Sequence, residues 1–275
     1  MIRTLSAVTE STDMKYFDSH AHYYDERFRE EYEGGAEALL SSCFSGSVSY
    51  IINVGTAPDT CRAAIEQARS HDRMYTVLGI HPTDGAYLSD IPKSLNEIRE
   101  MILDKASKCV ALGEIGLDYH YPDTNKEAQI ELFRTQMKMA EELSLPVVIH
   151  DRDSHEDVMK IVREFPRVKG VFHSFSGSAE MARELVSLGY MLSFSGTVTF
   201  KNARRPKEAA AAVPLDRILI ETDCPYLAPH PKRGTLNHSM NLEYTLREIA
   251  NIKGVSEEEC AKITEDNAKR FFGIE

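Results

Sequence analysis

Histidine and aspartate residues in this sequence follow short apolar runs, where their side chains could bind metal ions. Val-Val-Ile precedes His150, Val-Phe precedes His173, and Asp223 follows the run Ile-Leu-Ile-Glu-Thr. A segment that begins with Tyr16 and Phe17 also leads into His20-Ala21-His22. Side chains two residues apart on a β-strand point to the same face, so His20 and His22 could both reach one cation.

Glu114, in the run Gly-Glu-Ile-Gly, could extend this set to two cations. Its two carboxylate oxygens could bridge a pair of ions. His150 and His173 would then bind the second ion, while Asp223 would complete the first or bind the attacking water. Imidazole with carboxylate suits zinc, manganese or iron, whereas magnesium usually prefers oxygen ligands. A lone histidine at a strand end is more often structural, but the whole set favours metal binding.

Such a centre requires a fold that gathers the ends of several strands. Short apolar runs rich in β-branched residues alternate with longer segments, and eight of them predict strands: Tyr16–His20, Tyr50–Val54, Tyr75–Ile80, Cys109–Glu114, Pro146–His150, Val168–His173, Tyr190–Phe194 and Arg217–Glu221. Buried strands joined by helices indicate parallel pairing. The pattern predicts a TIM-type (β/α)8 barrel over residues 16–275, with its active site at the carboxyl ends of the strands. An open doubly wound sheet is the alternative.

Helical spacing of apolar residues appears between these runs and after the last of them. It predicts helices over Asp59–Ser70, Lys126–Leu143, His155–Phe165, Ala179–Leu188, Ser239–Ile252 and Ser256–Phe272. We expect Asp59 to cap the first of these helices.

The composition of the 275 residues is that of a globular protein with a large core, and the net charge of -11 argues against broad binding to duplex nucleic acid. No apolar run is long enough for a membrane span. Residues 1–15 are polar and lack the pattern of a secretory signal, so we interpret them as a flexible N-terminal extension. The five scattered cysteines indicate no disulfide framework. We therefore expect a monomer in the cytoplasm or the nucleus.

Two loops carry positive charge where they would border the active site. Lys232 and Arg233 stand in a Pro/Gly-rich segment after the eighth predicted strand, and a second basic loop follows the seventh, with Lys201, Arg204 and Arg205. A basic pair in such a place could bind a phosphate.

Taken in order, the motifs of the chain resemble the TatD family of metal-dependent deoxyribonucleases, within the amidohydrolase-like barrels. The resemblance runs from about Tyr16 to Gly273. It rests on the segments Phe17–His22, Gly79–Pro82, Gly113–Tyr119, Pro146–His150, His173–Gly177, Phe194–Phe200 and Glu221–Leu227. It implies a TIM-type barrel, a divalent cation site and phosphodiester hydrolysis, often at the 3′ ends of single strands.

Carried over residue by residue, the resemblance implies that metal is bound by His20, His22, Glu114, His150, His173 and Asp223. It also suggests that Arg233 meets the substrate phosphate. The family commonly has Ser where Cys224 stands, and a Glu-Pro pair where His238 and Ser239 stand. These differences alter the loop near the active site, so the resemblance bears more directly on metal binding than on substrate preference.

The expected reaction is hydrolysis by a metal-activated water, with two magnesium, manganese or zinc ions per chain. Asp223 would orient that water or take its proton, and His81 and Arg233 would stabilise charge on the phosphate. The expected partner is single-stranded or frayed DNA, whose bases could stack on aromatic side chains: Tyr119, Tyr121, Phe175 and Phe200. The alternatives are a hydrolase of amides, lactones or aminoacyl esters, and a barrel that only binds a partner.

Overall fold

The computed structural model describes residues 14–275, which form an eight-stranded parallel sheet in the order β1 to β8. The strands are β1 (Tyr16–Ala21), β2 (Val48–Gly55), β3 (Met74–Leu78), β4 (Cys109–Asp118), β5 (Val147–Arg152), β6 (Gly170–Phe172), β7 (Met191–Phe194) and β8 (Ile218–Ile220). The predicted (β/α)8 barrel is confirmed, and each predicted strand overlaps an observed one. Of the predicted extension 1–15, residues 1–13 lie outside the described part of the chain.

The barrel closes between β1 and the chain that follows β8. An isolated parallel bridge pairs Ala21 with Cys224. The backbone N–H of His22 donates to the Cys224 carbonyl at 2.8 Å, and that of Asp223 donates to the His20 carbonyl at 2.9 Å. The bonds that close the barrel therefore also bring Asp223 beside the histidine pair.

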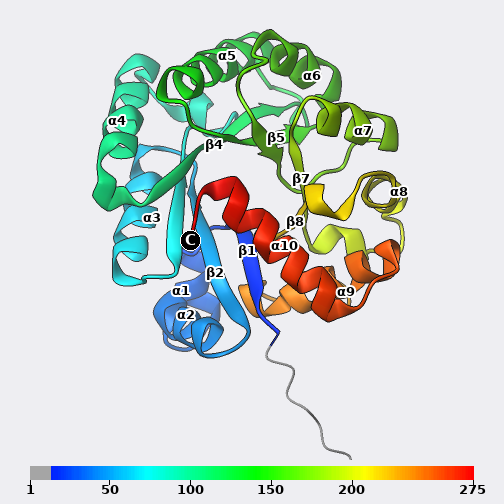
Figure 1. Ribbon diagram of the computed structural model, residues 1–275. Helices are drawn as coiled ribbons and strands as arrows, with labels where there is room; N and C mark the ends of the chain where they lie inside the picture. The colour runs from blue at the N-terminus through cyan, green and yellow to red at the C-terminus, as the bar shows by residue number, and fades with distance from the viewer. Residues whose placement is uncertain (1–13) are drawn as a thin grey trace, which may run out of the picture.

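Helices surround the sheet, and Figure 1 shows them as an outer ring around the strands. They are α1 (Glu26–Glu31), α2 (Gly35–Ser45), α3 (Pro58–Ser70), α4 (Ile91–Leu103), α5 (Lys126–Leu143), α6 (His155–Glu164), α7 (Ala179–Ser187), α8 (Arg204–Ala212), α9 (Leu242–Lys253) and α10 (Glu257–Phe272). Short 3-10 turns are η1 (Asp84–Tyr87), η2 (Lys105–Ser107), η3 (Gly196–Thr199), η4 (Leu215–Arg217) and η5 (Ser239–Asn241).

The predicted helices are all present, with small changes at their ends. Asp59 does not cap α3, because that helix begins earlier, after Ala57. The hydroxyl of Thr60 accepts the Ala57 N–H at 2.9 Å and so satisfies this end of the helix. The expected helix over Ser239–Ile252 begins with the 3-10 turn η5 before α9.

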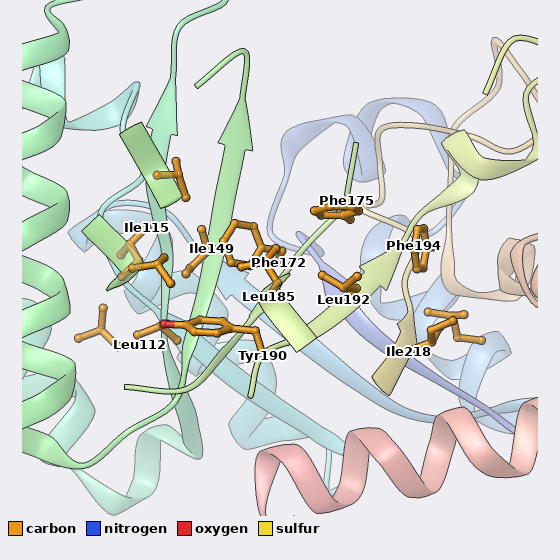
Figure 2. Packing of buried hydrophobic residues seen from close by; sticks show 14 of the residues in the cluster. Leu112, Ile115, Ile149, Phe172, Phe175, Leu185, Tyr190, Leu192, Phe194 and Ile218 are labelled. Atoms are coloured by element: carbon orange, nitrogen blue, oxygen red, sulfur yellow. The ribbon is translucent and has the colours of Figure 1, made fainter. Parts of the chain in front are cut away.

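Apolar residues on the two faces of the strands form two layers. One layer fills the barrel interior and takes a residue from every strand: Phe17, Ile52, Val77, Ala111, Val148, Val171, Met191 and Leu219. The other lies between strands and helices, and Figure 2 shows part of it, including Ile149, Phe172 and Leu192. These three residues are paired in register across β5, β6 and β7. The alternation along each strand is that of a sheet buried on both faces.

The C-terminal helix covers the N-terminal end of the barrel. Phe272 of α10 stacks on Phe17 near the start of β1, with ring centroids 6.1 Å apart, and Figure 1 shows α10 crossing the barrel. The opposite end of the barrel, formed by the carboxyl ends of the strands, is where the polar residues gather. Within residues 14–275 no helix is long and apolar enough to cross a membrane.

Candidate metal centre

Glu114 lies at the centre of a group of buried imidazoles. Its Oε2 is 3.3 Å from His20 Nε2 and 3.9 Å from His22 Nε2. Its Oε1 is 2.9 Å from His150 Nδ1 and 2.7 Å from His173 Nε2. The two carboxylate oxygens thus face two separate pairs of histidines. This is the arrangement in which one carboxylate can bridge two cations.

Asp223 completes the group from the other side of the histidine pair. Its Oδ1 is 3.3 Å from His22 Nε2 and 3.7 Å from His20 Nε2. Asp223 has a positive φ of 57°, an uncommon conformation for a residue with a side chain. The hydrogen bond from its N–H to the His20 carbonyl holds this turn in place. The structure therefore gathers all six predicted ligand residues into one cluster.

Glu114 lies inside β4 rather than at its end, because the strand continues to Asp118. The pairing of β4 with β5 shifts register between Leu112 and Ile115, which places Glu114 at the irregularity. Beyond it, Gly116 has a φ of 141°, and a Cβ there would overlap the backbone oxygen of His150. The close approach of the two strands brings Glu114 and His150 together and requires glycine.

Hydrogen bonds outside the cluster hold three of the four ligand histidines. Glu221 Oε1 lies 3.2 Å from His173 Nδ1. Asp118 Oδ2 lies 3.1 Å from His150 Nε2, and the Val54 carbonyl lies 2.8 Å from His22 Nδ1. The opposite ring nitrogen of each histidine faces Glu114 or Asp223. Such partners fix the ring orientation and tautomer of metal-binding histidines.

Neither Glu221 nor Asp118 was expected from the sequence to support the site. The available signal was their spacing, since Glu221 stands two residues before Asp223 and Asp118 four residues after Glu114. A charge so close in sequence to a ligand, on the same strand or in the segment that follows it, is a candidate for supporting that ligand or its neighbour.

Asp18 is a further buried carboxylate that the sequence analysis did not assign. It accepts hydrogen bonds from Thr222 Oγ1 at 2.6 Å, from the Thr222 N–H at 2.9 Å and from Ser239 Oγ at 2.7 Å. Burial raises its pKa to about 6, although these hydrogen bonds oppose the shift. Asp18 therefore ties β1 to the residue that precedes Asp223.

Electrostatics keep the two carboxylates of the cluster ionised. Burial alone would raise the pKa of Glu114, but His173, His81 and His20 outweigh it and hold the pKa well below its ordinary value. Burial likewise opposes ionisation of Asp223, whose pKa is nevertheless lowered by His22 and the other imidazoles. Ionised carboxylates are the form that binds cations.

His81, predicted to contact substrate, lies at the edge of the same cluster. Its Nε2 is 3.6 Å from Glu114 Oε1, and its ring centroid is 4.4 Å from that of His150. The Thr83 N–H donates to its Nδ1 at 3.2 Å. Burial and His150 lower the pKa of His81 to about 3, so the ring is neutral near pH 7. With Nδ1 an acceptor, the proton is on Nε2, which makes His81 a hydrogen-bond donor toward the centre.

The donor set fits divalent cations. Three groups of side chains each place their ligand atoms within 4.8 Å of one another: His20, His22 and Glu114; His20, His173 and Asp223; and His81, Glu114 and His150. Imidazole nitrogen and carboxylate oxygen together suit zinc, manganese or iron. The buried Nδ1 of His20 has no hydrogen-bond partner among the described residues. The six predicted ligands all belong to these groups, which also include His81: His20, His22, Glu114, His150, His173 and Asp223.

Arg233 lies apart from this cluster, on the exposed loop after β8. Its guanidinium packs over the ring of Phe200, 4.5 Å from the centroid. The His230 N–H donates to Thr199 Oγ1 at 2.8 Å, so the loops after β7 and β8 are joined. The exposed cations of these loops and of the first turn of α8 form what we call the basic rim: Lys201, Arg205, Lys232 and Arg233. Arg204 is instead paired with Glu208 of α8.

Comparison with known proteins agrees with this geometry. The family model described as TatD related DNase matches residues 17–273. The metal-dependent hydrolase YabD of Bacillus subtilis is 42% identical over 260 residues, which cover 94% of this chain and 99% of YabD. YcfH of Escherichia coli K12, also named a metal-dependent hydrolase, is 35% identical over 94% of this chain and 96% of its own.

A solved structure extends the likeness to the fold. The structure of YJJV, a TatD homologue from Escherichia coli K12, superposes with a TM-score of 0.88 at 28% identity. The match covers 96% of this chain and 100% of YJJV. The chain therefore belongs to the TatD family and is a metal-dependent hydrolase.

Proposed function

We propose that this protein hydrolyses phosphodiester bonds of DNA and acts on single-stranded or frayed ends. The observation that carries the proposal is the position of Glu114, whose two oxygens face two separate pairs of histidines. A carboxylate so placed suits a pair of bridged cations, and such pairs act on both the attacking and the leaving oxygen of a phosphodiester. The name of the matching family model, TatD related DNase, supports the same substrate class.

Bound divalent cations would supply Lewis acidity and lower the pKa of a water molecule. The side chains then have distinct roles. Asp223 is ionised and near His22, and would take a proton from the attacking water. His81 would donate its Nε2 hydrogen to a phosphate oxygen as negative charge develops. Glu114 would keep its charge throughout, because its imidazole neighbours hold its pKa low.

The charge distribution favours a short stretch of single strand over a duplex. The chain carries a net charge of -11, which repels a long polyanion. The basic rim is a local exception beside the active site and would bind the phosphates that flank the scissile bond. Arg233 is the member that we assign to this contact.

The test is cleavage of single-stranded DNA labelled at its 3′ or its 5′ end, with Mn²⁺ or Mg²⁺ added. A blunt hairpin and a single-stranded RNA of the same sequence serve as competing substrates. Glu114→Gln and EDTA should each abolish cleavage, whereas Glu142→Gln on the exposed surface of α5 should not. Cleavage that persists in both Glu114→Gln and EDTA would refute the mechanism. Hydrolysis of a lactone or an aminoacyl ester without cleavage of DNA would refute the proposal that DNA is the substrate.

A further inference from the structure

A cavity of about 980 Å³ opens between the loops that follow β3 and β4. Its walls come from η1, from the segment 121–125 and from the first turns of α5. Tyr87 and Tyr121 both line it. The exposed fraction is 88% for Tyr87 and 54% for Tyr121, so each presents an aromatic surface to solvent.

The cavity lies next to His81, at the edge of the metal centre. Thr83 lines it, and Thr83 Oγ1 lies 2.7 Å from His81 Nδ1. His81 in turn faces Glu114 at 3.6 Å. Pro82, between Thr83 and His81 in sequence, is also part of the wall. A ligand held by its phosphate at the centre could therefore extend past His81 into this cavity.

The charge of the wall excludes a second phosphate. Among the described residues that line the cavity there is no lysine, arginine or histidine. Two carboxylates, Asp123 and Glu131, are present, with hydroxyl and amide groups from Thr124 and Asn125. Such a wall repels phosphate and accepts a neutral planar group that can form hydrogen bonds.

Exposed apolar side chains concentrate on this end of the barrel. Of the large hydrophobic residues in 14–275 that are exposed, four stand in loops after β3, β4 and β8: Tyr87, Tyr121, Tyr226 and Leu227. The fifth, Leu103, ends α4 near the opposite end of the barrel. Exposed aromatic residues grouped beside a polar site are typical of ligand contact.

Tyr121 is the most exposed of the four expected base-stacking residues. Phe175 is buried, Phe200 is covered by Arg233, and the hydroxyl of Tyr119 donates to Asp157 at 3.0 Å. The ring of Tyr121 lies against His120, with centroids 5.3 Å apart. The Arg152 guanidinium lies over the same ring, 6.0 Å from its centroid, and Tyr121 remains exposed.

We propose that this cavity binds a nucleobase of the single strand, stacked on Tyr87 and Tyr121, next to the phosphodiester that is cleaved. The inference rests on the proposed function and identifies the base-binding subsite. Helix α4, after the β3 loop, and helix α8, after the β7 loop, lie on opposite sides of the barrel (Figure 1). The basic rim thus holds phosphates on one side of the centre, and the cavity holds the last base on the other.

The experiment compares a single-stranded oligonucleotide with the same strand carrying an abasic residue at its end. In the wild-type protein, loss of the base should raise KM about tenfold, the typical value of one stacked base. Tyr87→Ala/Tyr121→Ala should raise KM similarly for the intact strand and remove the difference between the two substrates. Tyr87→Phe/Tyr121→Phe should retain that difference, because phenylalanine also stacks. Leu103→Ala, an exposed apolar residue far from the centre, is the control.

A second measurement tests the subsite without cleavage. A strand with terminal 2-aminopurine should lose fluorescence on binding in Ca²⁺, and the double alanine variant should abolish this quenching. Quenching without cleavage by the wild-type protein in Mn²⁺ or Mg²⁺ would refute the proposed function and retain the subsite. Cleavage with unchanged KM and unchanged quenching in the double alanine variant would overturn the subsite alone. Absence of both quenching and cleavage in the wild-type protein would overturn the subsite and the proposed function together.

Discussion

Glu221 hydrogen-bonds His173 on the side of the imidazole that faces away from the metal centre. The distance from Glu221 Oε1 to His173 Nδ1 is 3.2 Å, while His173 Nε2 lies 2.7 Å from Glu114 Oε1. The same Glu221 oxygen accepts the Ser174 N–H at 2.7 Å. The carboxylate thus fixes both the ring and the backbone that carries it. Glu221 stands two residues before Asp223. One short segment therefore supplies the candidate ligand Asp223 and the carboxylate that orients the candidate ligand His173.

Glu221→Gln should therefore weaken metal binding without unfolding the barrel. The substitution retains shape and removes the charge that favours the required His173 tautomer, so we expect metal affinity to fall about 10- to 100-fold. Titration of the metal-free protein with Mn²⁺ or Zn²⁺ measures this. Glu141→Gln, which removes the charge of a surface pair with Arg167, should leave the affinity unchanged. Equal affinities in wild type and Glu221→Gln would show that Glu221 does not support the ligand.

Metal affinity should also fall as the pH is lowered. Burial lowers the pKa of His173, but Glu114 and Glu221 outweigh it and raise the pKa well above its ordinary value in the metal-free protein. Burial also opposes protonation of His150, whose pKa is raised by Asp118 and Glu114. A cation must displace these protons, so acidic pH disfavours binding. We expect about a tenfold loss per pH unit for each displaced proton. Calorimetry in buffers of different ionisation enthalpy counts those protons, and none released would contradict this account.

The positions of the six candidate ligands could be predicted because metal-binding residue types occur where the apolar pattern predicts the ends of strands. His150 and His173 each follow a short β-branched run, and parallel strands bring such ends together. The position of Glu114 was less accessible. Its strand runs on to Asp118, and the register shift that directs Glu114 inward depends on contacts with β5. Sequence periodicity does not carry that information.

Arg233→Ala should affect substrate binding and not the metal centre. Arg233 is exposed on the basic rim and contacts Phe200 rather than any candidate ligand. We expect KM for single-stranded DNA to rise severalfold with little change in kcat, and the slope of log KM against log salt to fall by about one. Metal content should be unchanged. Arg167→Ala removes an equal charge near the N-terminal end of the barrel and is the control. A loss of kcat at unchanged KM would contradict a phosphate-binding role.

Gly116→Ala should destabilise the protein and disturb the metal centre. A Cβ would overlap the His150 carbonyl oxygen at a positive φ of 141°, so β4 and β5 must separate. We expect a loss of about 2–4 kcal/mol in the free energy of unfolding, from overpacking and backbone strain together. Gly254→Ala, with a φ of 69° and open space around it, should cost about 1 kcal/mol. Urea denaturation measures both. Similar losses of unfolding free energy in the two variants would show that the close approach of β4 and β5 does not require glycine at position 116.

Several features that the sequence did not reveal depend on partners that are distant in sequence. Asp18 joins Thr222 and Ser239, which lie more than 200 residues away in sequence. Helix α4 is a different case: it was not predicted, although the helical spacing of Ile91, Leu95, Ile98 and Ile102 is a local signal for it. The exposure of Tyr87 and Tyr121, which line one cavity, depends on how the loops after β3 and β4 fold. No local pattern distinguishes those tyrosines from buried ones.

We expect Glu114 to join two cations held by His20, His22, His150, His173 and Asp223. Crystals of the protein with Mn²⁺, measured by anomalous diffraction, test it most directly. We expect two peaks about 3.5–4 Å apart on either side of the Glu114 carboxylate. Both peaks should weaken or vanish in Glu114→Ala. Peaks elsewhere in the molecule, or full occupancy of both sites without Glu114, would contradict the account.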